Sequence, residues 1–151
     1  MAIQTSAGTT IGISATLPTT FDAVASTGYP AETYTTVGEV VEVPSFGSVY
    51  NLITHNPLGE REIVKRKGSI NHGTITISFA ADASDAGQTA LKAAHSSDDE
   101  VAFHLTYPDG EDDYFTGLVM NWNIVPGSAD SIKSGSITIE LTRAPVNVAA
   151  A

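Results

Sequence analysis

Four histidines are the residues best suited to acid–base or metal chemistry in this sequence. His55, His72, His95 and His104 are scattered, and no two of them stand four residues apart, as a pair on one face of a metal-binding helix would. His104 alternates out of phase with its apolar neighbours, so we expect a solvated histidine on a strand. The sequence contains no Cys, which excludes disulfides, thiol nucleophiles and thiolate metal ligands.

Motifs for a serine nucleophile and for calcium are missing as well. A nucleophile elbow would read Gly-x-Ser-x-Gly, which does not occur. The acidic run 109–113 lacks the alternating Asp-x-Asp-x-Asp-Gly pattern of a calcium loop, and it is better interpreted as a charged hairpin tip after Pro108. We therefore expect no catalytic residues, no metal and no cofactor, and we expect that the protein is not an enzyme.

The strongest concentration of charge is a basic window within residues 56–72. This window holds four of the 7 Lys and Arg residues, in a chain whose net charge is −10. No aromatic residues interleave, as they would in a segment that binds nucleic acid. A solvated loop is one interpretation, and a loop that complements an acidic surface on another copy is the other. We expect a long intersubunit loop at 56–72, with contacts from Leu58, Glu60, Arg61, Glu62, Ile63, Val64, Lys65, Arg66 and Lys67.

Three acidic residues lie directly after the predicted helix. The carboxyl end of a helix disfavours negative charge, so this placement has no local explanation. A cationic loop of a neighbouring subunit would supply one. The candidates for this contact are Asp98, Asp99 and Glu100.

The composition is that of one acidic domain. At 151 residues the chain can bury a core of its own, and we expect 1–151 to form a single domain. The 17 Asp and Glu argue against a protein that grips DNA, which needs a cationic surface. No apolar run approaches the ~18 residues of a membrane span, and the N-terminus lacks the pattern of a signal peptide. We expect no membrane partner.

Alternation of apolar and polar residues predicts short strands through most of the chain. We expect one amphipathic helix at 84–96, loops at 19–32 and 56–72, a frayed tail at 146–151, and strands at 9–17, 34–43, 49–55, 73–80, 100–107, 114–125 and 133–143. The fold class that follows is mainly β: an antiparallel sandwich or barrel of about seven strands, flanked by one short α-helix.

The phases of these elements give a candidate core. Leu91 lies on the apolar stripe of the helix and is expected to face the sheet. In the second strand Val37, Val41 and Val43 are expected on one face with Glu39. The other residues expected inside are Ile75, Ile77, Phe79, Leu118, Met120, Trp122, Ile124, Ile137, Ile139 and Leu141.

The order of elements from Gly73 to Pro145 resembles the conserved core of the lambda-type major tail tube proteins of long-tailed bacteriophages. An alternating strand, a short helix, two strands around the turn at 108–110 and a last strand closing in Arg-Ala-Pro follow one another in that order. The long segment before Gly73 also has a counterpart in that family, a mobile loop that becomes ordered on assembly. The family's additional C-terminal immunoglobulin-like domain is not expected in this chain.

The resemblance implies a structural subunit. In that family, subunits form hexameric rings whose inner sheets join into a continuous β-barrel, and the rings stack into a tube through which DNA is ejected. The resemblance also implies a protein of the virion tail, assembled in the host cytoplasm. Its partners would be further copies of itself, the tape measure protein, the tail terminator and baseplate or tail-tip proteins. The alternative is a phage or bacterial β-sandwich decoration or adhesion module that binds carbohydrate or a protein partner.

A tube of this kind needs a channel that does not hold DNA. A negatively charged, hydrated wall repels phosphate, so DNA passes without specific binding. The polar sides of the strands at 73–80 and 133–143 could line the channel, or they could form a solvent-facing outer sheet. The channel candidates are Thr74, Thr76, Ser78, Thr138 and Glu140, with Glu39 and Glu42 of the second strand as competing candidates.

Overall fold

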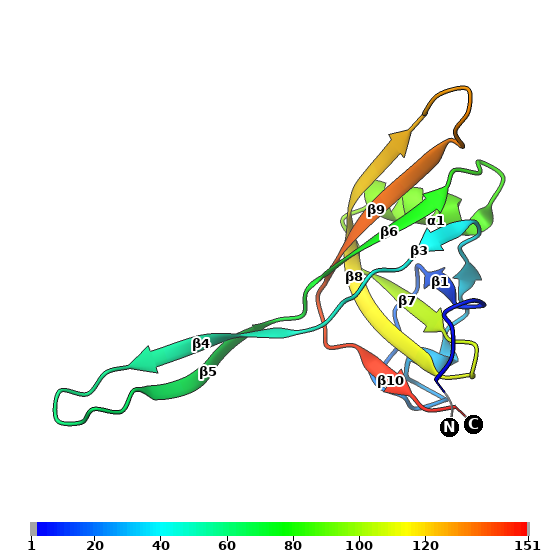
Figure 1. Cartoon of the computed structure of the whole chain (residues 1–151). Helices are drawn as coiled ribbons and strands as arrows, with labels where there is room; N and C mark the ends of the chain where they lie inside the picture. Colours follow the sequence, from blue (N-terminus) through cyan, green and yellow to red (C-terminus); the bar gives the residue numbers. More distant parts are fainter. Residues whose placement is uncertain (1–2, 151) are drawn as a thin grey trace.

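The structure, a computed structural model, describes residues 3–150 and is mainly β (Figure 1). A curled sheet forms the body, and a two-stranded hairpin projects from it as an arm. The elements are β1 (Thr10–Ser14), the 3-10 helix η1 (Tyr29–Ala31), β2 (Thr35–Thr36), β3 (Val40–Glu42), β4 (Val49–His55), β5 (Val64–Asn71), β6 (Thr74–Ala80), α1 (Ala86–Ser96), β7 (Val101–Thr106), β8 (Asp112–Val125), β9 (Ser134–Leu141) and β10 (Val146–Val148). The mainly β class and the short helix are confirmed, and residues 1, 2 and 151 of the predicted domain lie outside the described residues.

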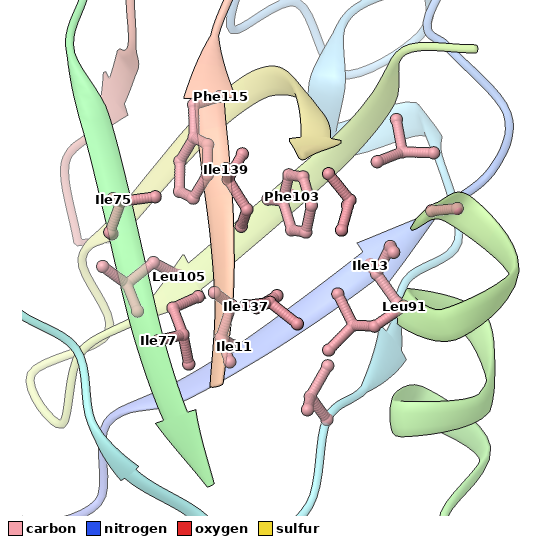
Figure 2. Packing of buried hydrophobic residues seen from close by; sticks show 14 of the residues in the cluster. Ile11, Ile13, Ile75, Ile77, Leu91, Phe103, Leu105, Phe115, Ile137 and Ile139 are labelled. Carbon is pink, nitrogen blue, oxygen red and sulfur yellow. The ribbon is translucent and has the colours of Figure 1, made fainter. Parts of the chain in front are cut away.

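The sheet of the body is antiparallel and runs in the order β2-β1-β7-β8-β9-β6-β3, with β10 pairing with β8 as well. It curls into a half-barrel, so β6 and β9 face β1 and β7 across a closed interior (Figure 2). One face of each strand therefore points inward, and the other points outward.

The interior of the half-barrel is the main hydrophobic core. β6 and β9 pair along their whole length, which places Ile75 opposite Ile139 and Ile77 opposite Ile137. None of these four side chains is more than 1% exposed. Their alternation with Thr and Ser in the sequence is thus the cause of the inward and outward faces. The same cluster includes Ile11, Ile13, Phe79, Phe103, Leu105, Phe115, Val119 and Leu141.

Helix α1 closes one side of this interior (Figure 2). Asp85 begins the helix by accepting a hydrogen bond from the Gln88 N–H at 2.9 Å. Leu91 is 1% exposed and packs in the core, as predicted. A Cβ on Gly87 would lie 2.4 Å from the Thr36 carbonyl oxygen, so this glycine lets the helix approach the β2 backbone.

The predicted continuous strand at 34–43 is wrong, because polar side chains at the start of α1 interrupt it at Gly38. Asp85 accepts a hydrogen bond from the Gly38 N–H at 3.0 Å, and the Gln88 side chain donates one to the Gly38 carbonyl at 3.0 Å. Glu39 then has a φ of 60°. The segment is divided into β2 and β3, and Gln88 fixes the helix to the break.

A bulge in β3 also changes the predicted phase of the valines. Val40 pairs with Phe79, and Glu42 pairs with Ser78, the residue before Phe79 in β6. Val41 is the extra residue and is 75% exposed, whereas Val37 is buried. The predicted common face is therefore wrong for Val41 and Glu39, whereas Val37 and Val43 both pack on the main core.

A second bulge divides β8. The register against β9 shifts directly after Val119, and the extra residue, Met120, is 60% exposed. Leu118 is half-buried on the outer face. The predicted inward phase is thus wrong for Leu118 and Met120, and it holds only beyond the bulge, where Trp122 is half-buried and Ile124 is 38% exposed.

The segment between β1 and β2 covers part of the outer face of the sheet. Tyr29 is fully buried there, and its hydroxyl lies 2.6 Å from the Thr116 hydroxyl. Its ring stacks on Tyr114 with 5.6 Å between the ring centroids. The predicted loop at 19–32 is therefore a cover that packs over β7 and the first half of β8, with η1 as its short helical turn.

His104 lies at the edge of this cover with its side chain 25% exposed, so the prediction of a solvated histidine is correct only in part. Its ring stacks on Tyr114 at 4.6 Å between centroids. Its Nε2 lies 2.9 Å from Asp112 Oδ1 and 2.9 Å from Thr106 Oγ1. The predicted phase, opposite to the main core, is correct, but the outer face is covered at this position.

Two further segments differ from the prediction. The predicted loop at 56–72 is half strand, because β5 pairs with β4 to form the arm. The predicted tail at 146–151 begins as β10, in which Val146 pairs with Tyr114 and Val148 with Asp112. A run of small residues gave no sign of this pairing, which depends on the exposed edge of β8.

Replacement of Leu91 by Ala is expected to lower the free energy of unfolding by about 2–5 kcal/mol, because it leaves a cavity beneath α1. Urea denaturation of the unassembled protein measures this loss. His95→Ala, at an exposed position of the same helix, is the control and should change stability little. Equal stabilities of the two variants would contradict the packing of α1.

Alkaline pH should destabilise the fold through the covered tyrosines. Burial raises the pKa of Tyr29, Tyr34 and Tyr114 above the ordinary value of 10.0. The unfolded chain loses these protons first, so the contribution of these tyrosines to stability should be fully present below pH 10 and be lost as the pH rises above it. Urea denaturation across this range measures the effect, and Tyr34→Phe should weaken the pH dependence. Tyr50→Phe, on the arm, controls for the loss of a tyrosine as such, and a pH dependence that is the same in both variants would contradict the assignment.

Candidate functional site

Two surfaces stand out among the described residues because nothing within 3–150 covers them. The first is the arm, formed by β4 and β5, which leaves the body between β3 and β6 (Figure 1). The second is the outer face of β6, β9 and the second half of β8, which the segment between β1 and β2 does not reach. We call this second surface the open polar face.

The arm exposes apolar side chains along its length. Its strands pair from Val49 opposite Asn71 to His55 opposite Val64, with an irregularity after Tyr50. A two-stranded hairpin has no core, and an isolated one is at best marginally stable in water. The large apolar side chains exposed on it are Val49, Tyr50, Leu52, Ile53, Leu58, Ile63 and Ile70.

Cations are mixed with these apolar side chains on β5. Lys65, Arg66 and Lys67 are all exposed. Strand alternation places the two lysines on one face and Arg66 on the other. Lys67 lies over the Tyr50 ring, with 4.6 Å from its Nζ to the ring centroid. Both faces of the arm thus combine apolar area with positive charge.

The predicted loop residues fall on two parts of the arm. Leu58 to Ile63 form its tip, beyond the last paired residues, and Leu58 is 105% exposed. The four residues from Val64 to Lys67 belong to strand β5. The pairing with β4 was not predicted, because the sequence gives no turn signal that links the two strands more closely than any other pair.

The open polar face brings five of the predicted channel residues together. Thr74 Oγ1 donates a hydrogen bond to Glu140 Oε2 at 2.8 Å, and Thr76 Oγ1 lies 3.4 Å from Thr138 Oγ1. Ser78 continues the row opposite Ser136. This surface contains hydroxyls and one carboxylate, and none of these positions carries a cation.

The two competing channel candidates, Glu42 and Glu39, lie in different places in the structure. Glu42 pairs with Ser78, so it lies at the β3 end of the open polar face. Glu39 precedes β3 and carries the positive φ described above. Asn121 and Asn123, which pair with Thr138 and Ser136, complete the face on β8. They were not among the predicted channel residues, although the inward phase predicted for Trp122 and Ile124 already places them outward.

The acidic residues after α1 have two different environments. Asp98 and Asp99 are exposed. Glu100 lies 3.8 Å from the Arg143 guanidinium, which also stacks on Phe21 at 3.7 Å from the ring centroid. Asp98 and Asp99 are therefore the members of the predicted set that are available to another molecule.

No group of three His, Asp or Glu side chains within residues 3–150 is placed to hold a metal ion. In the same residues no helix is long and apolar enough to cross a membrane. The functional features of the described chain are therefore extended surfaces.

The sequence matches the family described as phage tail tube protein, TTP, over residues 1–150. The chain belongs to the phage tail tube protein family. It is accordingly a structural component of a virion tail and not an enzyme, as the resemblance implied, and the match favours this function over a decoration or adhesion module. No curated protein matches the sequence.

Solved structures share the fold at low sequence identity. The tail of an empty gene transfer agent particle, refined with C6 symmetry, has a TM-score of 0.68 and 10% identity over 97% of this chain and 100% of that chain. A sheath/tube terminator of an extracellular contractile injection system gives 0.67 and 10% over 99% of each chain. The SPP1 tail tube gives 0.63 and 12% over 92% of this chain and 75% of that one.

Proposed function

We propose that this tail tube protein polymerises with copies of itself into hexameric rings that stack into a tube with a negatively charged channel for DNA ejection. The fold is shared with the tail of a gene transfer agent particle that was refined with C6 symmetry. In this proposal the ends of the tube meet a tape measure protein, a tail terminator and a baseplate or tail-tip protein.

The observation that carries the proposal is the arm. It exposes seven large apolar side chains and four cations, and within residues 3–150 it has no surface to pack on. The four cations of the arm are suited to an acidic surface on another copy of this chain, whose net charge is −10. Such a contact would also bury the apolar side chains of the arm. Asp98 and Asp99, exposed after α1, are such a surface.

The open polar face is proposed as the wall of the channel. DNA that passes through a tube must not be held by any subunit, because each Lys or Arg in contact with phosphate would add affinity through counterion release. Thr, Ser and Asn side chains with Glu42 and Glu140 make most of this surface hydrated and free of cations, with Leu118 and Val125 as its apolar members on β8. A closed ring would place this face, repeated in every subunit, toward its centre.

Electron microscopy of the purified protein tests polymerisation directly. Tubes or stacked rings with six-fold symmetry are expected once the concentration is high enough for assembly. A protein that stays monomeric at all concentrations, or that forms tubes of another symmetry, would contradict the proposed ring.

Reversal of three cations on the arm should block assembly and leave the subunit folded. The triple variant Arg61→Glu, Lys65→Glu, Arg66→Glu changes only exposed positions, so its melting temperature should stay near that of the wild type. Sedimentation and electron microscopy should then find no tubes. The control keeps the charges, as Arg61→Lys, Lys65→Arg, Arg66→Lys, and should assemble. Tubes of normal length from the reversed variant would contradict a role of the arm between subunits.

Lysines on the open polar face should slow DNA ejection without preventing assembly. Ser78→Lys and Thr138→Lys are suitable because these positions are diagonal across β6 and β9, so the two new charges do not stand directly opposite each other. Phage that carry both changes should form normal tails and eject DNA more slowly or incompletely. Thr19→Lys with Ala25→Lys, two exposed positions on the covering segment, is the control. Wild-type ejection through assembled Ser78→Lys, Thr138→Lys tails would place this face outside the channel.

A further inference from the structure

A pocket of about 280 Å³ lies between the first turns of α1 and the far ends of β6, β8 and β9. Its apolar lining includes Trp122 and Ile124 of β8. The Trp122 ring packs against the Phe79 ring, with 5.4 Å between the centroids, and Trp122 is half-buried. The pocket therefore has an apolar floor that another side chain can cover.

Two of the three cations outside the arm line this pocket. Lys92 comes from α1, and Lys133 directly precedes β9. The ion pairs within residues 3–150 are His104–Asp112 and Arg143–Glu100, so both lysines are free of carboxylate partners there. Asp82 also lines the pocket, but its Oδ1 already accepts hydrogen bonds from the Ser84 N–H and hydroxyl at 2.9 and 2.6 Å. The rim thus holds two ammonium groups and one carboxylate, which leaves it net positive in a chain of net charge −10.

The tip of the arm has the complementary chemistry. Leu58 is 105% exposed, which is complete exposure on a turn. Glu60 and Glu62 follow it and are exposed as well. An apolar side chain with two nearby carboxylates matches an apolar floor with two ammonium groups.

The positions of the arm and the pocket permit a head-to-tail contact between copies. The arm enters β6 at Thr74, and the pocket lies just beyond Ala80, where β6 ends. The two surfaces therefore lie at opposite ends of one strand. A contact between different surfaces of identical subunits repeats without closing on itself when it runs along an axis, as stacking in a tube requires.

We propose that the arm tip of one subunit docks in this pocket of a subunit in the next ring, with Leu58 covering Trp122 and Ile124, and with Glu60 and Glu62 facing Lys92 and Lys133. The inference rests on the proposed function, since it identifies the surface that receives the arm. It assigns a role to two lysines, to the tryptophan and to the acidic residues of a basic arm.

The first test exchanges the charges. Lys92→Glu with Lys133→Glu should fold normally and raise the concentration needed for assembly at least tenfold. Adding Glu60→Lys and Glu62→Lys should restore assembly. A control with Glu32→Lys and Asp109→Lys in their place has the same net charge as the restored variant and should not assemble.

The second test uses Trp122, which is the single tryptophan of the chain. Its emission should shift to shorter wavelength when wild-type subunits assemble, because the arm tip excludes water from its ring. Leu58→Ala, at a concentration that gives tubes, should lose this shift. Ile3→Ala removes a similarly exposed apolar side chain elsewhere and should keep it.

The outcomes separate this inference from the proposed function. Normal assembly of the Lys92→Glu, Lys133→Glu variant would overturn the pocket assignment, and so would a charge-exchanged variant no better than its control or an unchanged emission shift in Leu58→Ala tubes. If the triple arm variant still fails to assemble in those cases, the arm keeps its role between subunits and another surface receives it. Normal assembly of both the pocket variant and the triple arm variant would overturn both proposals.

Discussion

The pairing of β6 with β9 is the interaction on which the rest of the molecule depends. Ile75, Ile77, Ile137 and Ile139 are buried in register, and a slip of one residue would turn all of them outward. The same register fixes the row of hydroxyls on the opposite side of the two strands. α1 packs on the buried side, and the arm begins where β6 begins. The core, the open polar face and the direction of the arm are thus set by one strand pair.

Elements with a regular period could be predicted from the sequence, and interruptions of that period could not. The strict alternation in β6 and β9, and the cap and stripe of α1, are local signals, and the structure confirms them. The break at Gly38 is different, because it is made by Asp85 and Gln88, which are almost fifty residues away in the chain. The bulges at Val41 and Met120 also lack a local signal, since an inserted residue in a strand resembles a normal apolar position until its neighbouring strand is known.

The residues of a candidate surface could be predicted from the sequence where they lie on a single strand. Thr74, Thr76 and Ser78 could be identified as a polar row because they alternate with the core within seven residues. Asn121 and Asn123 lie outward, as the phase of Trp122 and Ile124 predicts, but the sequence does not show that β8 pairs with β9 and so adds them to this face. The pocket beside α1 combines side chains from four separate segments, so nothing in the sequence relates Lys92, Trp122 and Lys133 to one another. The arm differs from the pocket, because the charged residues at its tip and on β5 were identified from the sequence. Its apolar positions in β4 have the pattern of an ordinary core strand, so their exposure could not be predicted.

The positive charge of the arm opposes unwanted pairing between the arms of free subunits. An exposed apolar hairpin with free edges tends to pair with its own copies, and such pairing would consume subunits before they reach a tube. Lys65, Arg66 and Lys67 stand on both faces of β5, so two arms that approach each other repel. The arm has four cations and two carboxylates, a net charge of +2, so the body carries −12 in a chain whose total is −10, and the cations of the arm are attracted to it. Arm and body are therefore of opposite sign, which disfavours contact between arms and favours contact of an arm with the body of another subunit. A basic segment in an acidic protein is then understandable without any bound nucleic acid, because its charge selects the surface on which the apolar side chains are buried.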